Sequence, residues 1–99
     1  MLMRGKVKYV RRNIWYEENS SDHWTSHNHA VRCTCTYAVT YSGDEIEIDE
    51  NDIRDFYDIS NITRDIIEQL NNDLHNVWVN YYEDEDGDYY LDDDLEDII

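Results

Sequence analysis

The stretch AVRCTCTYAVTYSGDEIEID, residues 30–49, carries the clearest structural pattern in the chain. Its first twelve residues alternate as a β-strand does, because successive side chains of a strand point to opposite faces. One face would hold Cys33, Cys35, Tyr37, Val39 and Tyr41, and the other Arg32, Thr34, Thr36 and Thr40. Ser42-Gly43-Asp44 is a turn signal, and residues 45–49 alternate again. The stretch therefore predicts a β-hairpin, with the cysteines on the buried face.

Residues N-terminal to this hairpin predict a further strand. Lys6 to Tyr16 is rich in Val, Tyr, Ile and Trp, which favour strands. Its alternation slips near Arg11 and Arg12, which predicts a bulge at that point. The polar residues 17–28 predict a loop.

The hydrophobic period changes to that of helices after residue 49. Asp49 or Asn51 would cap a short helix. Ser60 or Asn61 would cap the main helix, at about residues 61–75. The apolar residues of this main helix are spaced by four, namely Ile62, Ile66, Leu70 and Leu74. Such an amphipathic helix should lie on the sheet and supply much of the core.

The C-terminal residues predict a second hairpin. Residues 77–82 have strand composition, residues 83–87 would form the loop, and residues 88–91 would return. A helix from about Glu83 is the alternative, but Gly87 inside it would cost about 1 kcal/mol. Residues 92–99 would form one helical turn or stay loose.

Length and composition complete the fold class. Ninety-nine residues predict one domain. Leu, Ile, Val and Phe supply 22 of them, and nine Tyr and three Trp add large apolar faces. We therefore expect a single α+β domain over residues 1–99. It would have a small antiparallel sheet of about four strands, one main amphipathic helix packed on the sheet, and a shorter helix.

The charge of the chain is large and uneven. The formal net charge is −16, with 24 acids against 8 bases. Residues 1–43, the basic strand region, sum to +3, whereas residues 44–99, the acidic helix and hairpin region, sum to −19. Small soluble domains usually carry a net charge of magnitude about 2–8, and an excess opposes folding through self-repulsion. The acidic charge is therefore expected to have a use.

The acidic C-terminal segment predicts a surface for a basic partner. Ten carboxylates fall in residues 83–97, interleaved with tyrosines that offer contact area at low entropic cost. The predicted partner-binding residues are Tyr82, Glu83, Asp84, Glu85, Asp86, Asp88, Tyr89, Tyr90, Asp92, Asp93 and Asp94. Acids on one strand face lie about 6.7 Å apart, too sparse to match a duplex with about one charge per 1.7 Å. Several elements must therefore pool their acids, and further acids at residues 45–49, 52–58 and 65–68 favour such an extended surface. The alternative is a solvated, loosely ordered acidic end.

Metal binding and catalysis find less support. Zinc candidates His23, His27, Cys33 and Cys35 lie close in sequence, with His29 nearby, but their spacing only half meets the usual pattern. Two core cysteines and surface histidines are the favoured interpretation. A calcium loop with Gly87 at its sixth position would start on Tyr82 rather than on Asp. No nucleophile elbow or glycine-rich phosphate loop is present in the sequence, so we expect no enzyme and no cofactor.

The basic N-terminal strand, with Arg4, Lys6, Lys8, Arg11 and Arg12, could alone bind single-stranded nucleic acid. The strongly anionic remainder would repel nucleic acid, however. These bases are instead expected to neutralise acids of the same molecule, or of a second copy in a homodimer. We expect a cytoplasmic protein with no membrane contact, because the sequence shows neither a secretion signal nor a run long enough to span a bilayer.

The acid-rich, tyrosine-interleaved second half, most of all Tyr81 to Leu95, resembles the small phage-encoded inhibitors that imitate DNA. This group includes anti-CRISPR, anti-restriction and uracil-DNA glycosylase inhibitor proteins, and the resemblance lies in composition and in the small mixed α/β layout. It implies a non-enzymatic inhibitor, acting in the host cytoplasm on the nucleic-acid-binding site of a CRISPR effector or another DNA-binding enzyme. It implies no direct contact with nucleic acid. The alternative is a small zinc-binding or oligomer-forming interaction module.

Overall fold

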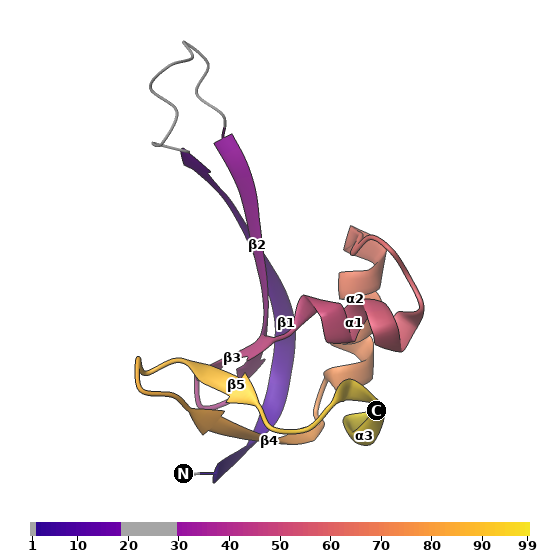
Figure 1. The fold of residues 1–99 in the computed structure, drawn as a ribbon. Coiled ribbons are helices and arrows are strands. Elements are labelled where there is room, and N and C mark those ends of the chain that lie inside the picture. The colour runs from indigo at the N-terminus through magenta and orange to yellow at the C-terminus, as the bar shows by residue number, and fades with distance from the viewer. Residues whose placement is uncertain (1, 19–29) are drawn as a thin grey trace.

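The computed structural model describes residues 2–18 and 30–99, which form five strands and three short helices (Figure 1). The elements are β1 (Leu2–Glu18), β2 (Ala30–Thr40), β3 (Glu45–Ile48), α1 (Glu50–Tyr57), α2 (Arg64–Leu74), β4 (Trp78–Glu83), β5 (Tyr89–Leu91) and α3 (Leu95–Ile98). Both predicted hairpins are present, as β2–β3 and β4–β5. The α+β class is confirmed, and the alternative of a helix from about Glu83 is wrong.

The five strands close into a barrel in the order β1-β2-β3-β5-β4, with β4 pairing back onto β1. Neighbours are antiparallel except β3 and β5, which run parallel over two residue pairs. The helices α1 and α2 connect β3 to β4. This is the connectivity of the OB-fold, a small Greek-key barrel. The predicted antiparallel sheet of about four strands is therefore wrong in strand number and in the direction of one pair, because neither barrel closure nor the β3–β5 pairing follows from local alternation.

The bulge in β1 lies at Lys8, not near Arg11 and Arg12 as predicted. Val7 pairs with Thr40 and Tyr9 with Val39, so Lys8 is the extra residue. Val7 and Val10 are both buried although they are three positions apart. One inserted residue restores the period of two between them. The bulge also falls where β1 changes partner, from β4 at residues 2–6 to β2 from Val7 onward.

Gly5 of β1 pairs with Val79 of β4 and lies close to side chains of β2 and β4. A Cβ at this position would lie 3.0 Å from Thr40 Cγ2 and 3.1 Å from Tyr81 Cε1. Such distances are tighter than ordinary contacts, so the absence of a side chain at Gly5 leaves room for the side chains of Thr40 and Tyr81. Gly5 itself is buried.

The interior face of β2 is the opposite of the predicted one. Thr36, Ala38 and Thr40 are 0–2% exposed and face the core. Cys35 and Tyr37 belong to the outer face, although Cys35 is covered to 8% exposure and Cys33 is half-buried. The predicted burial of this face holds only in part: Cys35 and Val39 are 8% and 6% exposed, but neither belongs to the core cluster, and Cys33 is half-buried. Threonine fills the interior positions because its hydroxyl finds acceptors there.

The helices cover one end of the barrel and complete the core (Figure 1). The predicted short helix is α1, and Asp49 caps it through the Asn51 amide. The predicted main helix is α2, but its cap is Thr63 rather than Ser60 or Asn61. Strands and helices both contribute buried core residues, among them Val7, Ile46, Ile48, Ile53, Leu70, Leu74, Val79 and Leu95.

The distal parts of β1 and β2 extend beyond the barrel as a two-stranded ribbon (Figure 1). β3 pairs only with residues 36–39 of β2, so residues 13–18 and 30–35 pair with each other alone. Ile14, Tyr16 and Val31 are 45–67% exposed on this ribbon. The ribbon is thus stabilised by its continuity with the barrel rather than by a core of its own.

A mostly buried polar network ties α1 to β1 and β2. Glu50 accepts hydrogen bonds from Thr34 and Thr36, each 2.7 Å long, and pairs with Arg12 at 3.2 Å. Arg12 also donates to the Ile62 carbonyl at 3.0 Å. Burial would raise the pKa of Glu50, but the hydrogen bonds from the threonines and Arg12 outweigh it and hold the pKa below its ordinary value.

Replacing Glu50 tests this network. Glu50→Ala should lower the free energy of unfolding by about 2 kcal/mol, because it leaves Arg12 without its partner and two hydroxyls without acceptors. Urea denaturation measures the loss. The control is Glu45→Ala, which breaks the exposed Arg11–Glu45 pair and should cost less than about 1 kcal/mol.

Comparison of the wild type with Glu50→Ala at different pH values tests the network a second time. Because the folded pKa of Glu50 is lower than the unfolded one, its contribution is present above the unfolded pKa and is lost as pH falls through the folded one. The gap between wild type and Glu50→Ala should therefore narrow below about pH 4. Equal losses for the two alanine variants, or a gap that persists in acid, would contradict a stabilising role for the network.

Candidate functional site

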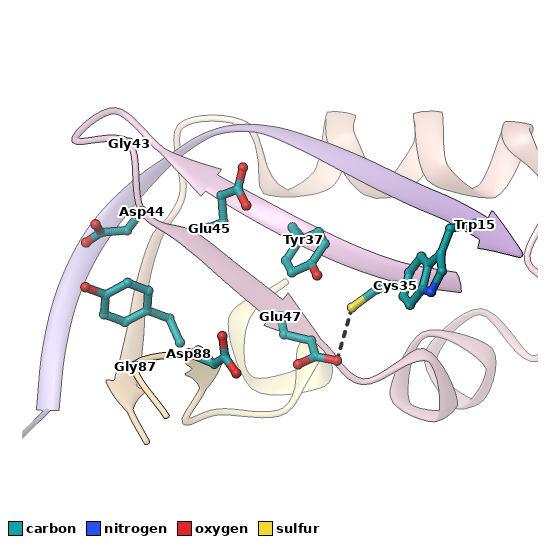
Figure 2. A pocket seen from close by; sticks show the side chains of 10 residues that line it. Trp15, Cys35, Tyr37, Gly43, Asp44, Glu45, Glu47, Gly87 and Asp88 are labelled. Atoms are coloured by element: carbon teal, nitrogen blue, oxygen red, sulfur yellow. Dashed lines mark hydrogen bonds between the residues drawn. The ribbon is translucent and has the colours of Figure 1, made fainter. Parts of the chain in front are cut away.

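A groove of about 520 Å³ lies between the outer face of the β2–β3 hairpin and the β4–β5 loop (Figure 2). Four carboxylates line it, from Asp44, Glu45, Glu47 and Asp88. The other side chains of the lining belong to Trp15, Cys35, Tyr37 and Tyr89, and none is basic. We call these eight residues, with Gly43 and Gly87, the acidic groove.

Strand alternation places these acids outside. In β3, Ile46 and Ile48 are 0–1% exposed and point into the barrel. Glu45 and Glu47 therefore point outward, toward the groove. Figure 2 shows Glu47 and Tyr37 on neighbouring strands, with Trp15 at one end of the groove and Asp44 and Asp88 toward the other.

The groove continues into two further depressions, of about 360 and 270 Å³. Glu47 lines all three hollows, and Tyr90 lines the second and third. The hollows therefore form one continuous surface, which we call the acidic face. Its carboxylates are Asp44, Glu45, Glu47, Asp49, Glu50, Asp52, Asp88, Asp93 and Asp94, and its aromatic rings are Trp15, Tyr37, Tyr82, Tyr89 and Tyr90.

Few cations of the same chain neutralise this face. In residues 2–18 and 30–99, only Glu45 and Glu50 of the face form ion pairs, with Arg11 and Arg12. Other carboxylates of the face accept from neutral donors, for example Asp44 from the Tyr81 hydroxyl at 2.6 Å and Glu47 from the Cys35 thiol at 3.1 Å. Neutral donors orient a carboxylate but do not neutralise its negative charge.

The pKa values of neighbouring groups report the negative potential. The charge of Glu47, followed by burial, raises the pKa of Tyr90 to about 12. The charge of Asp44 comes first among the causes that raise the pKa of Tyr89. Burial comes first for Asp52, and nearby aspartates add to it, so the pKa of this carboxyl is raised. Nearby negative charge thus contributes to favouring the protonated form of each of these groups.

The thiol in the groove is poorly suited to chemistry. Burial is the largest of the effects that raise the pKa of Cys35 to about 11, and the charges of Glu47 and Glu50 add to it. Nucleophilic and metal-binding cysteines act as thiolates, which form readily when the pKa is lowered. Cys35 therefore remains a protonated thiol that donates to Glu47.

The structure brings together only part of the predicted partner-binding set. Asp88 and Tyr89 line the acidic groove, and Tyr82, Tyr90, Asp93 and Asp94 line the depression of about 270 Å³. The others line none of the three hollows; they are Glu83, Asp84, Glu85, Asp86 and Asp92.

The loop between β4 and β5 owes its shape to Asp84. The carboxylate of Asp84 accepts from the backbone amides of Asp86 and Asp88, at 3.0 and 2.8 Å. These bonds account for the close approach of the three aspartate side chains, whose oxygens lie within 4.8 Å of one another. The clustering is thus explained by the turn itself.

Other residues of the face were not in the predicted set. Asp44, Glu45 and Glu47 belong to the β2–β3 hairpin, and Trp15 and Tyr37 to β1 and β2. The alternation of residues 45–49 was a usable signal, since it places Glu45 and Glu47 on one outer face. What joins them to Asp88 and Tyr90 is the parallel pairing of β3 with β5, which no local pattern encodes.

The structure describes two of the four zinc candidates. His23 and His27 lie outside the described residues, and Cys33 and Cys35 are free thiols. The expectation for the basic strand is met in part. Arg11 and Arg12 pair with acids of the same chain, whereas Arg4 and Lys6 lie 5.6 and 5.9 Å from the ring centres of Trp78 and Tyr41.

No protein-family model, curated protein or solved structure matches the chain. Across the ranges 2–18 and 30–99, the helices are all too short or too polar to cross a bilayer. The geometry and charge of the acidic face are therefore the observations that bear on function.

The ionisation of Tyr90 tests the negative potential of the face. Glu47→Gln should lower the pKa of Tyr90 from about 12 toward the ordinary tyrosine value near 10, because the Glu47 charge is the largest cause of the shift. NMR titration of the Tyr90 ring protons measures this, over the pH range in which circular dichroism shows the protein folded. Glu68→Gln on α2 removes the same charge elsewhere and should leave the pKa unchanged. A Tyr90 that titrates identically in wild type and both variants would contradict the described surface.

Proposed function

We propose that this protein is a non-enzymatic inhibitor whose acidic face docks onto the nucleic-acid-binding site of a host defence or DNA-processing protein, such as a CRISPR effector. The supporting observation is the continuity of the acidic face. Nine carboxylates border hollows that all include Glu47; they come from the β2–β3 turn, β3, the N-cap and first turn of α1, the β4–β5 loop and the segment before α3. A joined negative surface attracts and orients a positively charged partner.

The barrel strengthens this proposal by the place it gives the acids. OB-folds bind oligonucleotides on the face of their second and third strands and with the loops between strands 1 and 2 and between strands 4 and 5. The acidic groove occupies the corresponding β2–β3 face and β4–β5 loop. Carboxylates there repel phosphates, so the same surface selects cations. The surface that binds nucleic acid in other OB-folds would thus carry negative charge in this protein. It would bind the basic sites to which nucleic acid itself binds.

Pooling of acids from several elements raises the charge density above that of a single strand, as mimicry of a duplex requires. One strand face offers a charge only about every 6.7 Å, against about 1.7 Å along duplex DNA. On the acidic face, β3 and β5 lie side by side and α1 adds Asp52 beside them. Aromatic side chains between the acids, such as Tyr82 and Tyr90, supply the contact area that a purely ionic surface lacks.

Displacement of DNA from a purified target tests the proposal. The probes are basic DNA-binding proteins, including a CRISPR effector and a restriction endonuclease, each bound to a labelled duplex. The protein should displace the duplex from at least one of them, and its affinity for that protein should fall at least about tenfold between about 0.05 and about 0.5 M salt. Binding that leaves the duplex in place, or that is indifferent to salt, would contradict the proposal.

Matched charge variants locate the contact. The triple change of Glu47→Gln, Asp93→Asn and Asp94→Asn should weaken binding by about tenfold, as expected for three charge contacts. The control is a triple change of Asp58→Asn, Asp65→Asn and Glu68→Gln on and beside the helices, which removes the same charge. Equal effects of the two triples would show that net charge, rather than the acidic face, determines binding.

A further inference from the structure

We infer that the acidic groove is a subsite for an arginine side chain of the partner, in preference to lysine. This inference rests on the proposed function, because it specifies which cation the acidic face receives. Its starting point is the cavity itself. The groove of about 520 Å³ is within the size range of ligand pockets and combines carboxylates with aromatic rings.

The walls of the groove offer two carboxylates without an ion pair. Glu47 projects from β3 and Asp88 follows the β4–β5 loop, and Figure 2 shows both reaching into the space between these elements. Among the described residues, neither Glu47 nor Asp88 forms an ion pair. The thiol of Cys35 donates to one oxygen of Glu47 at 3.1 Å, which fixes this side chain and leaves its charge intact.

The protein already holds one guanidinium on the same surface. Arg11 lies with Cζ 5.0 Å from the ring centre of Tyr37, and its Nη2 pairs with Glu45 at 2.9 Å. Tyr37 and Glu45 both line the groove. The outer face of the hairpin therefore shows, with a residue of the chain itself, how a ring and a carboxylate together accommodate an arginine. The open part of the groove offers the same two kinds of group: the carboxylates of Glu47 and Asp88, the Tyr89 ring next to Asp88 in the chain, and the Trp15 ring at the opposite end.

Arginine suits such a site better than lysine does. Its planar guanidinium presents several donors to carboxylates in a fixed fork, stacks on aromatic rings and is more weakly hydrated than an ammonium group. A lysine ammonium is a compact, strongly hydrated charge that gains less from the rings. A groove that used charge alone would bind the two equally.

Two peptides of equal length and charge separate these possibilities. The full chain is titrated by calorimetry with an octa-arginine and with an octa-lysine peptide, at low salt. The arginine peptide should bind at least about fivefold more tightly, from one stacked and forked contact. The double variant Glu47→Gln with Asp88→Asn should weaken arginine-peptide binding and reduce the preference to below about twofold.

The control is Asp65→Asn with Glu68→Gln on α2, which has the same change in charge and should keep the preference. Unchanged circular dichroism and melting temperature confirm that both double variants are folded. Equal affinity of wild type for the two peptides overturns the arginine subsite while leaving an acidic docking face in place. A preference that survives in the groove variant also overturns it. Failure of both peptides to bind contradicts the proposed function as well.

Discussion

Electrostatic repulsion among the carboxylates of residues 44–99 opposes every contact that holds this protein together. This half of the chain has 21 acids and two bases, and the described residues form only three ion pairs. Folding brings these acids closer than they would be in an extended chain, which costs free energy. The apolar core must outweigh that cost. Under the proposed function, a basic partner that docks on the acidic face would supply the counter-charge and offset part of this cost.

The fold separates the charge from the core by strand alternation and by barrel closure. β3 points two isoleucines inward and two glutamates outward, and the closed order of strands leaves the apolar faces covered. Glu50 is the exception, since its side chain is only 16% exposed at the edge of the acidic face and is satisfied by Arg12 and two threonines. Acids on the outer face are held instead by neutral donors, such as the Tyr81 hydroxyl and the Cys35 thiol. Their side chains are oriented without being neutralised.

The elements of this fold could be predicted from the sequence, and their assembly could not. Alternation and turn residues located both hairpins, and spacing by four located α2, because these signals arise from neighbours in the chain. Barrel closure depends on β1 pairing with β4 more than seventy residues later, and the bulge at Lys8 on the need to bury Val7 and Val10 together. The candidate site could be predicted only in part, for the same reason. The acids of residues 45–49 were expected to contribute to an extended surface, but the predicted partner-binding set stayed within the C-terminal run. Only the parallel β3–β5 pair joins Asp88 and Tyr90 to Glu47, and no local pattern encodes that pair.

If the acidic face is a defined surface of a folded barrel, the electrostatic potential near it should be more negative than elsewhere on the molecule. This near-surface potential can be measured residue by residue. Paramagnetic cosolutes of opposite charge enhance the NMR relaxation of nearby protons to different extents, and the ratio gives the local potential. We predict the most negative values for protons of β3, β5 and residues 92–94, and clearly less negative values along α2 and the basic strand β1. A potential that is equally negative around the whole molecule, or most negative on α2, would contradict a defined acidic face.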